Sequence, residues 1–273
     1  MKSILVHLDA SPRAAVRLAM ARSLARRHGA ELTALYGVLP SILASPWAAG
    51  ESMAYAASAL ADLDQAQRER ARAVFEQAVS DGALNWVDGG TAPYWSLLQH
   101  ALTSDLVVLG QADAGDALTG ALPPDLVPAC IADSGKPTLV VPFAGKFEPN
   151  AKQVLIAWKP TREAARAVTA ALPWLRQAER VLVASQPEVD ERRGDAGTSI
   201  EHWLRNHDIA APIHSHRVGT GDAGESLLSL AADTGADLLV MGCYGHSRAR
   251  EWVLGGVTRT VLESMTLPVL MVH

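Results

Sequence analysis

The chain has 273 residues, of which 49% are apolar and 19% charged, and its formal net charge is -5. This length admits one large domain or two ordinary ones, and the composition is typical of a globular chain rather than a disordered one. The negative charge disfavours nucleic acid as a partner, and the absence of a long apolar run disfavours a membrane. Two cysteines and a start that lacks a signal-peptide core predict a cytoplasmic protein.

The sequence repeats itself in the same order along the chain. Three pairs of segments match, at offsets of 150, 132 and 131 residues: Ile4–Asp9 with Val154–Lys159, Asp105–Gly110 with Asp237–Gly242, and Pro137–Val141 with Pro268–Val272. The offset falls from 150 to 132 residues between the first and second pairs, so the first copy is longer than the second in that interval. We expect the extra residues to form an inserted loop or lid between Pro40 and Leu60. We expect two homologous domains, residues 1–145 and 151–273, joined by a polar tether at Ala144–Asn150.

The first long helix of the first copy is bounded by local signals. Val16, Ala19, Met20 and Leu24 form a stripe at helical spacing, and Gly29 stands where a C-terminal cap is expected. The arginines between them, Arg17 among them, predict a solvated face.

In the second copy, short β-branched or Leu-rich runs alternate with helical patterns. Strands are predicted at Gln153–Trp158, Arg180–Ser185, Ile213–Arg217, Leu238–Gly242 and Val269–Val272. The spacing Thr198-Ser199-Ile200-Glu201 is that of a capping box, so a helix is expected to start there and to end near His207. This alternation predicts an α/β fold in which helices cover both faces of a parallel sheet.

The segment after the fourth strand of the second copy carries the features of an anion site. Four glycines, Gly242, Gly245, Gly255 and Gly256, flank a basic loop and open a helix. A glycine-rich helix start exposes backbone N–H groups at the positive end of the helix dipole, where phosphate binds well. Side chains that can add hydrogen bonds or charge there are His246, Ser247, Arg248 and Thr258.

The G-x2-G-x9-G spacing, followed by Gly-Val-Thr and a closing Leu-Pro-Val-Leu-Met-Val, resembles the ATP-binding motif of the universal stress protein (UspA-like) family. The resemblance covers nearly the whole chain as two tandem family domains. It implies two doubly wound, five-stranded parallel sheets of order 3-2-1-4-5, the Rossmann-like fold of the adenine nucleotide alpha hydrolase-like group. It also implies a cytoplasmic stress-response protein whose cofactor is ATP, or ADP or AMP, accompanied by Mg²⁺ where ATP is bound.

The resemblance assigns roles to individual residues of the second copy. Those it sets around ribose and phosphate are Gly242, Gly245, His246, Gly255, Gly256, Val257 and Thr258, and those near the adenine end are Ala157, Lys159 and Ala184. Two positions depart from the family pattern, which usually has Ser or Thr at Gly256 and Asp at Lys159. Gly256 removes one hydroxyl contact, while Lys159 is expected either to meet a phosphate or to disturb the adenosine end.

The first copy lacks most of the motif. At the 132-residue offset, Asp113 stands opposite Gly245, Pro123 and Pro124 opposite Gly255 and Gly256, and Asp125 opposite Val257. Proline removes backbone donors and aspartate repels an anion, so a degenerate first domain is expected. It nevertheless retains Asp9, at the position where the family usually has Asp.

Three functions remain open on the sequence. The first is adenine-nucleotide binding by the second domain in stress response or signalling, which we expect. The second is a weak ATP hydrolase, although no Walker-type Lys-Ser/Thr pair and no Gly-x-Ser-x-Gly elbow occur. The third is a scaffold that binds no nucleotide.

Other features predict no further site. His214 and His216 alternate on one strand but lack a third ligand, so no metal site is expected. Cys243 is expected to be a small buried residue. The duplication predicts an intramolecular pseudo-dimer, with a homodimer as a further possibility and a protein partner whose identity stays unknown.

Overall fold

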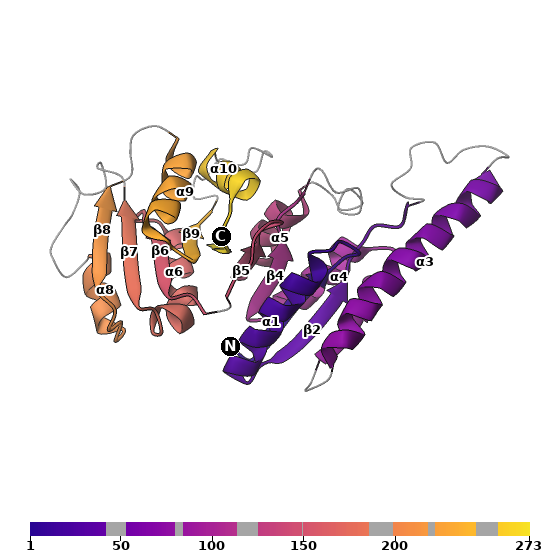
Figure 1. Ribbon diagram of the computed structural model, residues 1–273, viewed down its shortest axis with the longest axis horizontal. Helices are drawn as coiled ribbons and strands as arrows, with labels where there is room; N and C mark the ends of the chain where they lie inside the picture. The colour runs from indigo at the N-terminus through magenta and orange to yellow at the C-terminus, as the bar shows by residue number, and fades with distance from the viewer. Residues whose placement is uncertain are drawn as a thin grey trace. The chain divides into compact units, whose positions relative to one another are not determined.

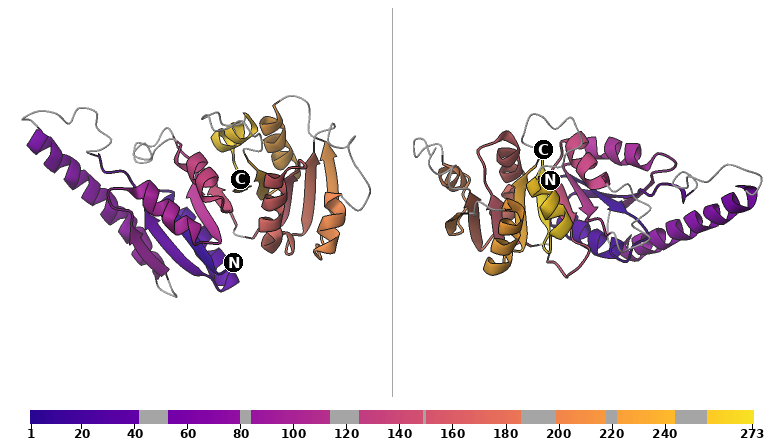
Figure 2. Two further views of the ribbon diagram at one scale, coloured as in Figure 1. Left: turned by 180° about the vertical axis from the view of Figure 1, so that it is seen from behind. Right: turned by 90° about the horizontal axis from the view of Figure 1, so that it is seen from above.

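The computed structural model describes residues 1–41, 53–79, 84–113, 125–148, 150–185, 199–217, 222–243 and 256–273. The chain divides into two compact units, Met1–Lys136 (unit 1) and Pro137–His273 (unit 2). Both units combine parallel strands with helices (Figure 1). Figure 2 shows that helices cover both faces of the sheet in each unit. The predicted α/β class is therefore confirmed.

Unit 1 contains the strands and helices of the first copy up to its fifth strand. In chain order they are β1 (Ser3–Leu8), α1 (Ala14–His28), β2 (Glu31–Tyr36), α3 (Met53–Ala78), β3 (Leu84–Asp88), α4 (Pro93–Leu102), β4 (Leu106–Gly110) and α5 (Leu126–Ser134). The strands lie in the order β3-β2-β1-β4, with parallel pairing throughout. This order is the first part of the expected 3-2-1-4-5 pattern.

Unit 2 contains the whole second copy together with the last strand of the first. In chain order its elements are β5 (Thr138–Val141), β6 (Gln153–Ala157), α6 (Arg162–Leu175), β7 (Arg180–Ser185), α8 (Ile200–Asn206), β8 (Ile213–Arg217), α9 (Ala223–Thr234), β9 (Leu238–Gly242), α10 (Gly256–Ser264) and β10 (Val269–Val272). The order β8-β7-β6-β9-β10 confirms the 3-2-1-4-5 pattern. One pairing departs from the parallel arrangement, because β5 runs antiparallel to β10.

The strands match the ranges predicted from sequence to within one residue, since Trp158 alone falls outside its strand. Sheets covered on both faces need apolar side chains at successive positions. The central strand β1 accordingly buries every residue from Ile4 to Leu8, and β10 is buried along its length. These two strands carry the core that lies beneath the carboxyl edge of each sheet.

Helix α1 ends as predicted, and of its predicted apolar stripe Met20 and Leu24 are buried, Val16 is half-buried and Ala19 is exposed. Gly29 adopts a left-handed φ of 56°, and its N–H caps the helix, which confirms the predicted end. The prediction that Arg17 is solvated is wrong, because its side chain is only 3% exposed. Arg17 lies one helical turn from the buried residues Ala14 and Ala21, and residues at this spacing share a face.

The extra residues of the first copy form a helix over much of their length. Residues 42–52 lie outside the described part of the chain, and α3 begins at Met53. The expected loop between Pro40 and Leu60 is therefore wrong for residues 53–60. Figure 1 shows α3 continuing well past the carboxyl end of β2.

The second half of α3 anchors the helix to unit 1. Ala71 packs with Tyr36 and Trp86, and Arg68 pairs with Asp88 at 2.9 Å. None of the helices in the described ranges is both long and apolar enough to cross a bilayer. Helix α3 has the length, but charged side chains interrupt it from Asp62 onward.

Helix α8 begins one residue later than the capping-box spacing predicts. Ser199 is its N-cap, and the Ser199 hydroxyl accepts a hydrogen bond from the His202 amide at 3.1 Å. Thr198, the expected first residue of the box, lies outside the described residues. The helix ends at Asn206 with His207 as its C-cap, which agrees with the predicted end.

Candidate functional site

The parallel strands of unit 2 end at one edge of the sheet, where ligands bind in folds of this type. The register pairs Ala157 with both Ala184 and Met241, and it pairs Gly242 with Val272. The structure therefore brings Ala157, Ala184 and Gly242 together, although they are far apart in sequence.

Lys159 lies in the turn that follows β6. Its side chain is exposed, and its carbonyl accepts a hydrogen bond from the Thr161 amide at 2.7 Å. The Thr161 hydroxyl in turn accepts from the Ala164 amide and caps α6. Lys159 is thus held at the rim of the edge by a short turn.

Gly242 makes the closest packing contact at this edge. A Cβ atom there would lie 2.4 Å from the backbone nitrogen of Ala164 and 2.5 Å from the carbonyl carbon of Glu163. Only a residue without a side chain lets the first turn of α6 approach the end of β9 so closely. The sequence interpretation, in which Gly242 makes room for a ligand, omitted this contact within the fold.

Glu163 is a buried acid that the sequence interpretation missed. Its side chain is 3% exposed and pairs with the Arg162 guanidinium. Burial alone raises the pKa of Glu163, but hydrogen bonds from Arg162, from its own amide and from Thr161 outweigh burial and lower it. The available signal was its position one turn before the buried Ala167 on the same face of α6.

Cys243 follows β9 and is buried, as the sequence predicts. Burial raises the pKa of the Cys243 thiol, and the negative charge of Glu163 raises it further. The residue is therefore a neutral thiol at pH 7 rather than a nucleophilic thiolate.

The start of α10 presents the next group of predicted residues. Gly256 is the first residue of the helix, it is exposed, and among the described residues no atom beyond its own helix backbone and chain neighbours lies within 4 Å of the place where its Cβ would stand. Val257 is half-buried, and Thr258 is buried with a relative exposure of 4%. The first turn of α10 thus has a solvent-exposed beginning and a buried inner side.

Helix α9 starts beside α10. Asp222 caps α9 by accepting hydrogen bonds from the Gly224 and Glu225 amides, and it also accepts one from the Thr260 hydroxyl at 3.2 Å. The amide hydrogen bonds lower the pKa of Asp222, which keeps its carboxylate ionised. Asp222 therefore joins the beginnings of the two helices.

The basic loop lies outside the described residues. Gly245, His246, Ser247, Arg248 and Gly255 all fall in the segment 244–255. Of the twelve predicted site residues, the structure thus describes Ala157, Lys159, Ala184, Gly242, Gly256, Val257 and Thr258.

The same edge of unit 1 contains a buried ion pair. Arg17 lies 2.8 Å from Asp9, which also accepts hydrogen bonds from the Ser11 amide and hydroxyl. Burial by itself raises the pKa of Asp9, but Arg17, together with His7 and Ser11, lowers it to about 2. The guanidinium lies against Gly110, where a Cβ atom would come within 2.5 Å of an Arg17 nitrogen.

His7 completes this buried cluster. Its Nε2–H donates to the Gly37 carbonyl at 2.8 Å, while its own carbonyl accepts from Arg17. Burial lowers the pKa of His7 and Arg17 lowers it further, against the opposing effects of Asp9 and of the bond to Gly37. The imidazole is therefore neutral at pH 7.

The residues that weaken the motif in the first copy are described only in part. Asp125 is the N-cap of α5, and its side chain forms no capping hydrogen bond. Helix α5 begins at Leu126, whereas Pro123 and Pro124 lie outside the described residues.

His214 and His216 both lie on β8, where His214 is exposed and His216 half-buried. Within the described ranges, no three side chains of His, Cys, Asp or Glu are grouped so that they could hold a metal ion.

Comparison with solved structures shows the same fold. The chain matches a universal stress protein from Archaeoglobus fulgidus with a TM-score of 0.64 and 15% identity, covering 99% of this chain and 95% of that one. It matches a functionally unknown protein, PA1789, from Pseudomonas aeruginosa with a TM-score of 0.59 and 15% identity, covering 100% and 92% of the two chains. At this identity the matches support the fold alone.

Sequence comparisons add the family. The chain is 44% identical over 50 residues to universal stress protein Slr1230 of Synechocystis sp., covering 18% of this chain and 17% of that protein. It is 38% identical over 48 residues to universal stress protein MJ0577 of Methanocaldococcus jannaschii, covering 18% of this chain and 30% of that protein. These alignments span less than a third of each relative. The family model described as "Universal stress protein family" matches residues 1–142 and 151–273. The chain therefore belongs to the Universal stress protein family and carries two of its domains in tandem.

Proposed function

We propose that the carboxyl edge of unit 2 binds an adenine nucleotide, ATP or else ADP or AMP, and that the protein acts in stress response or signalling through this binding. Family membership and the glycine spacing of the second copy support the proposal. The proximity of Ala157, Ala184 and Gly242 at one edge supports it further.

The observation that carries the proposal is the start of α10. Gly256 opens the helix, is exposed, and has open space where a side chain would stand. The first N–H groups of a helix lack partners within the helix and lie at the positive end of its dipole. A phosphate group is the ligand that such a helix start favours.

The other residues have subordinate roles in this proposal. The half-buried Ala157 offers a small side chain to the adenine end, Ala184 lies buried beside it, and the exposed Lys159 supplies positive charge at the rim. From the sequence alone, His246, Ser247 and Arg248 add charge and hydrogen bonds around the phosphates. Mg²⁺ accompanies ATP rather than occupying a site formed by the protein.

Unit 1 does not bind a nucleotide in this proposal. Its edge contains the buried pair of Arg17 with Asp9, and the guanidinium lies against Gly110, the counterpart of Gly242. A ligand there would have to separate two buried opposite charges, which is strongly unfavourable.

We propose binding rather than hydrolysis. Glu163 is a buried carboxylate at this edge. Its hydrogen bonds with Arg162 and Thr161 keep it ionised, but they already use its oxygen atoms. A base that activates water has to reach the water directly.

One observation favours a second candidate, a scaffold that binds no nucleotide. Gly242 is required for the contact with α6, so its presence is explained without any ligand. Lys159 and Gly256 also depart from the residues that family members usually have at these positions. In this alternative the two tandem domains serve to present surfaces to a protein partner.

Two substitutions of Gly256 test the nucleotide proposal. Proline at the first position of a helix preserves the helix but removes one N–H donor, and proline is the residue of the first copy at this position. A lost hydrogen bond to a charged group corresponds to about 1.5–3 kcal/mol. We therefore expect Gly256→Pro to weaken ATP binding, measured by calorimetry on the full chain, by about tenfold or more.

Gly256→Ala is the matched control, because it keeps the N–H and fits the open space. It should bind ATP within about threefold of the unchanged protein. Nucleotide released on denaturing the purified protein, identified by mass spectrometry, would establish which of ATP, ADP and AMP is bound. Absence of binding to all three nucleotides by the unchanged protein would favour the scaffold.

A further inference from the structure

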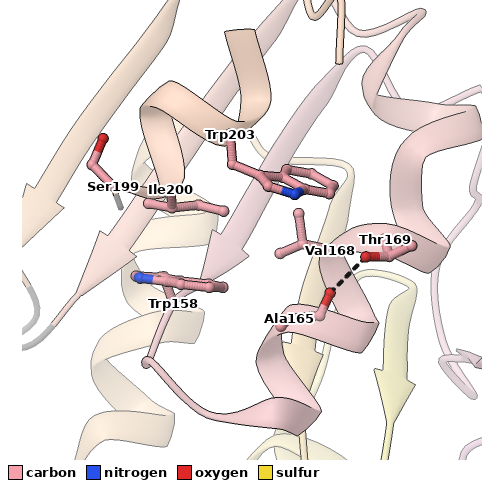
Figure 3. A pocket seen from close by; sticks show the side chains of 7 residues that line it. All are labelled: Trp158, Ala165, Val168, Thr169, Ser199, Ile200 and Trp203. Carbon is pink, nitrogen blue, oxygen red and sulfur yellow. Dashed lines mark hydrogen bonds between the residues drawn. The ribbon is translucent and has the colours of Figure 1, made fainter. Parts of the chain in front are cut away.

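Unit 2 has a second concavity, which lies between α6 and α8. It has a volume of about 130 Å³, and the rings of Trp158 and Trp203 form two of its sides. Figure 3 shows Val168 between the two rings and Ile200 above Trp158. Trp158 comes directly after β6, whereas Trp203 projects from α8, so two separate elements build the pocket.

The walls of this pocket are apolar. Besides the two tryptophans, Val168, Ile200 and the methyl group of Ala165 line it. Val168 and Ile200 are buried, so the floor of the pocket belongs to the rigid core of the unit. The Trp203 ring is supported by the His207 ring, with the two centroids 3.9 Å apart.

The polar side chains that line the pocket already have partners. The Thr169 hydroxyl donates to the Ala165 carbonyl at 2.9 Å, as Figure 3 shows. The Ser199 hydroxyl accepts from the His202 amide as the cap of α8. No carboxylate, ammonium or guanidinium group is among the described residues that line the pocket. An anionic ligand would therefore lose its hydration there without compensation.

The size of the pocket limits the ligand. A dry, apolar cavity of about 150 Å³ is large enough to hold benzene. Aromatic rings also attract one another beyond the burial of their surface, by about 0.5–1.5 kcal/mol per pair. The two indole rings face the pocket from different sides, so an aromatic ligand can contact both.

We propose that this pocket binds a small, neutral aromatic molecule of one ring between Trp158 and Trp203. The site is distinct from the nucleotide edge, since none of the described residues that line it is among those proposed to hold a nucleotide. Trp158 nevertheless precedes Lys159 directly, so the two sites share the turn between β6 and α6.

Benzene is the probe for the test. The indole N–H signals of the full-length protein are followed by nitrogen-15 NMR while benzene is added, and Trp→Phe variants assign the signals. We expect saturable shifts of the Trp158 and Trp203 signals, with the buried Trp174 unaffected. Benzoate should bind at least tenfold more weakly than benzene, because its carboxylate finds no cation among the described lining residues.

A substitution at the rim checks the location. Ala165 is an exposed residue of α6 that lines the pocket, so Ala165→Phe fills the space without disturbing the core. It should weaken benzene binding at least tenfold. The matched control is Ala232→Phe, at an exposed alanine of α9 away from the pocket, which should leave binding unchanged.

Several results would overturn the proposal. They are the absence of saturable shifts up to the solubility of benzene, equal shifts of Trp174, benzoate binding as tight as that of benzene, or full affinity in Ala165→Phe. The first three concern the unchanged protein, so they decide the matter even if the variant is unstable. Gly256→Pro should retain benzene binding, which separates this test from the nucleotide proposal.

Discussion

The carboxyl edges of the two units have the same strand arrangement but different chemistry. In unit 1, Asp9 and Arg17 form a buried ion pair, and the guanidinium lies against Gly110. At the corresponding positions of unit 2, 150 residues later, stand Lys159, which is exposed, and Ala167, which is buried. There the backbone of α6, rather than a side chain, lies against Gly242.

This comparison shows how equivalent edges of a duplicated fold acquire different chemistry through single side chains. One arginine on the inner face of α1 satisfies the acid at the end of β1 from within the chain. In unit 2 an alanine stands in place of the arginine and Lys159 in place of the acid, so no ion pair forms between these two positions. The exposed Lys159 remains at the rim of the edge. The difference between the edges therefore depends on single side chains, and substitutions can test it directly.

The largest effect is expected from Arg17→Ala. Removing one partner of a buried ion pair leaves the other charge uncompensated, which costs about 3–5 kcal/mol. We expect a loss of that size in the free energy of unfolding, measured by urea denaturation of the full chain. Hydrogen exchange of the β1 amides would assign the loss to unit 1.

Arg26→Ala is the control for this change, because Arg26 is an exposed arginine of the same helix. It should alter stability by no more than about 0.5 kcal/mol. Similar losses in both variants would contradict the assignment of a buried ion pair to Arg17.

A somewhat smaller effect is expected from acid. The pKa of Asp9 is lowered from 3.8 to about 2 in the folded protein. A lowered carboxyl pKa stabilises the fold fully above pH 4, and this stabilisation is lost as the pH falls from about 4 to 2. One pH unit of difference corresponds to about 1.4 kcal/mol, so the loss attributable to Asp9 is about 2 kcal/mol.

Urea denaturation between pH 5 and pH 2 measures this dependence. The asparagine of Asp9→Asn cannot ionise. The free energy of unfolding of this variant should therefore fall by about 2 kcal/mol less over this range than that of the unchanged protein. Equal declines in the two proteins would mean that the Asp9 carboxylate is not stabilised as the structure indicates.

The smallest of these effects concerns the other edge. Gly242→Ala adds a methyl group that meets the backbone of α6, and such overpacking costs about 1–3 kcal/mol. Gly256→Ala, which adds the same group where there is open space, should not destabilise the protein by packing. Thermal unfolding of the two variants compares them, and an undiminished melting temperature in Gly242→Ala would contradict the close contact.

Much of the candidate site could be located from the sequence. The glycine spacing marked the end of β9 and the start of α10, and the resemblance to the family assigned Ala157 and Ala184, which stand at or near the ends of two predicted strands. The roles of Arg17, Glu163 and Gly242 could not be found in the same way. An arginine on an amphipathic helix is usually solvated, so burial of Arg17 depends on Asp9 and Gly110, which other elements supply.

The sequence by itself determined the duplication, the strand positions and the end of α1, because buried strands and glycine caps leave their mark on neighbouring residues. It also indicated the order of the strands, through the resemblance to the family. Only the tertiary structure decided that β5 pairs with β10 and that an internal arginine occupies the edge of unit 1. Those features arise from contacts between residues far apart in the chain, whose side chains meet only after the sheets have formed.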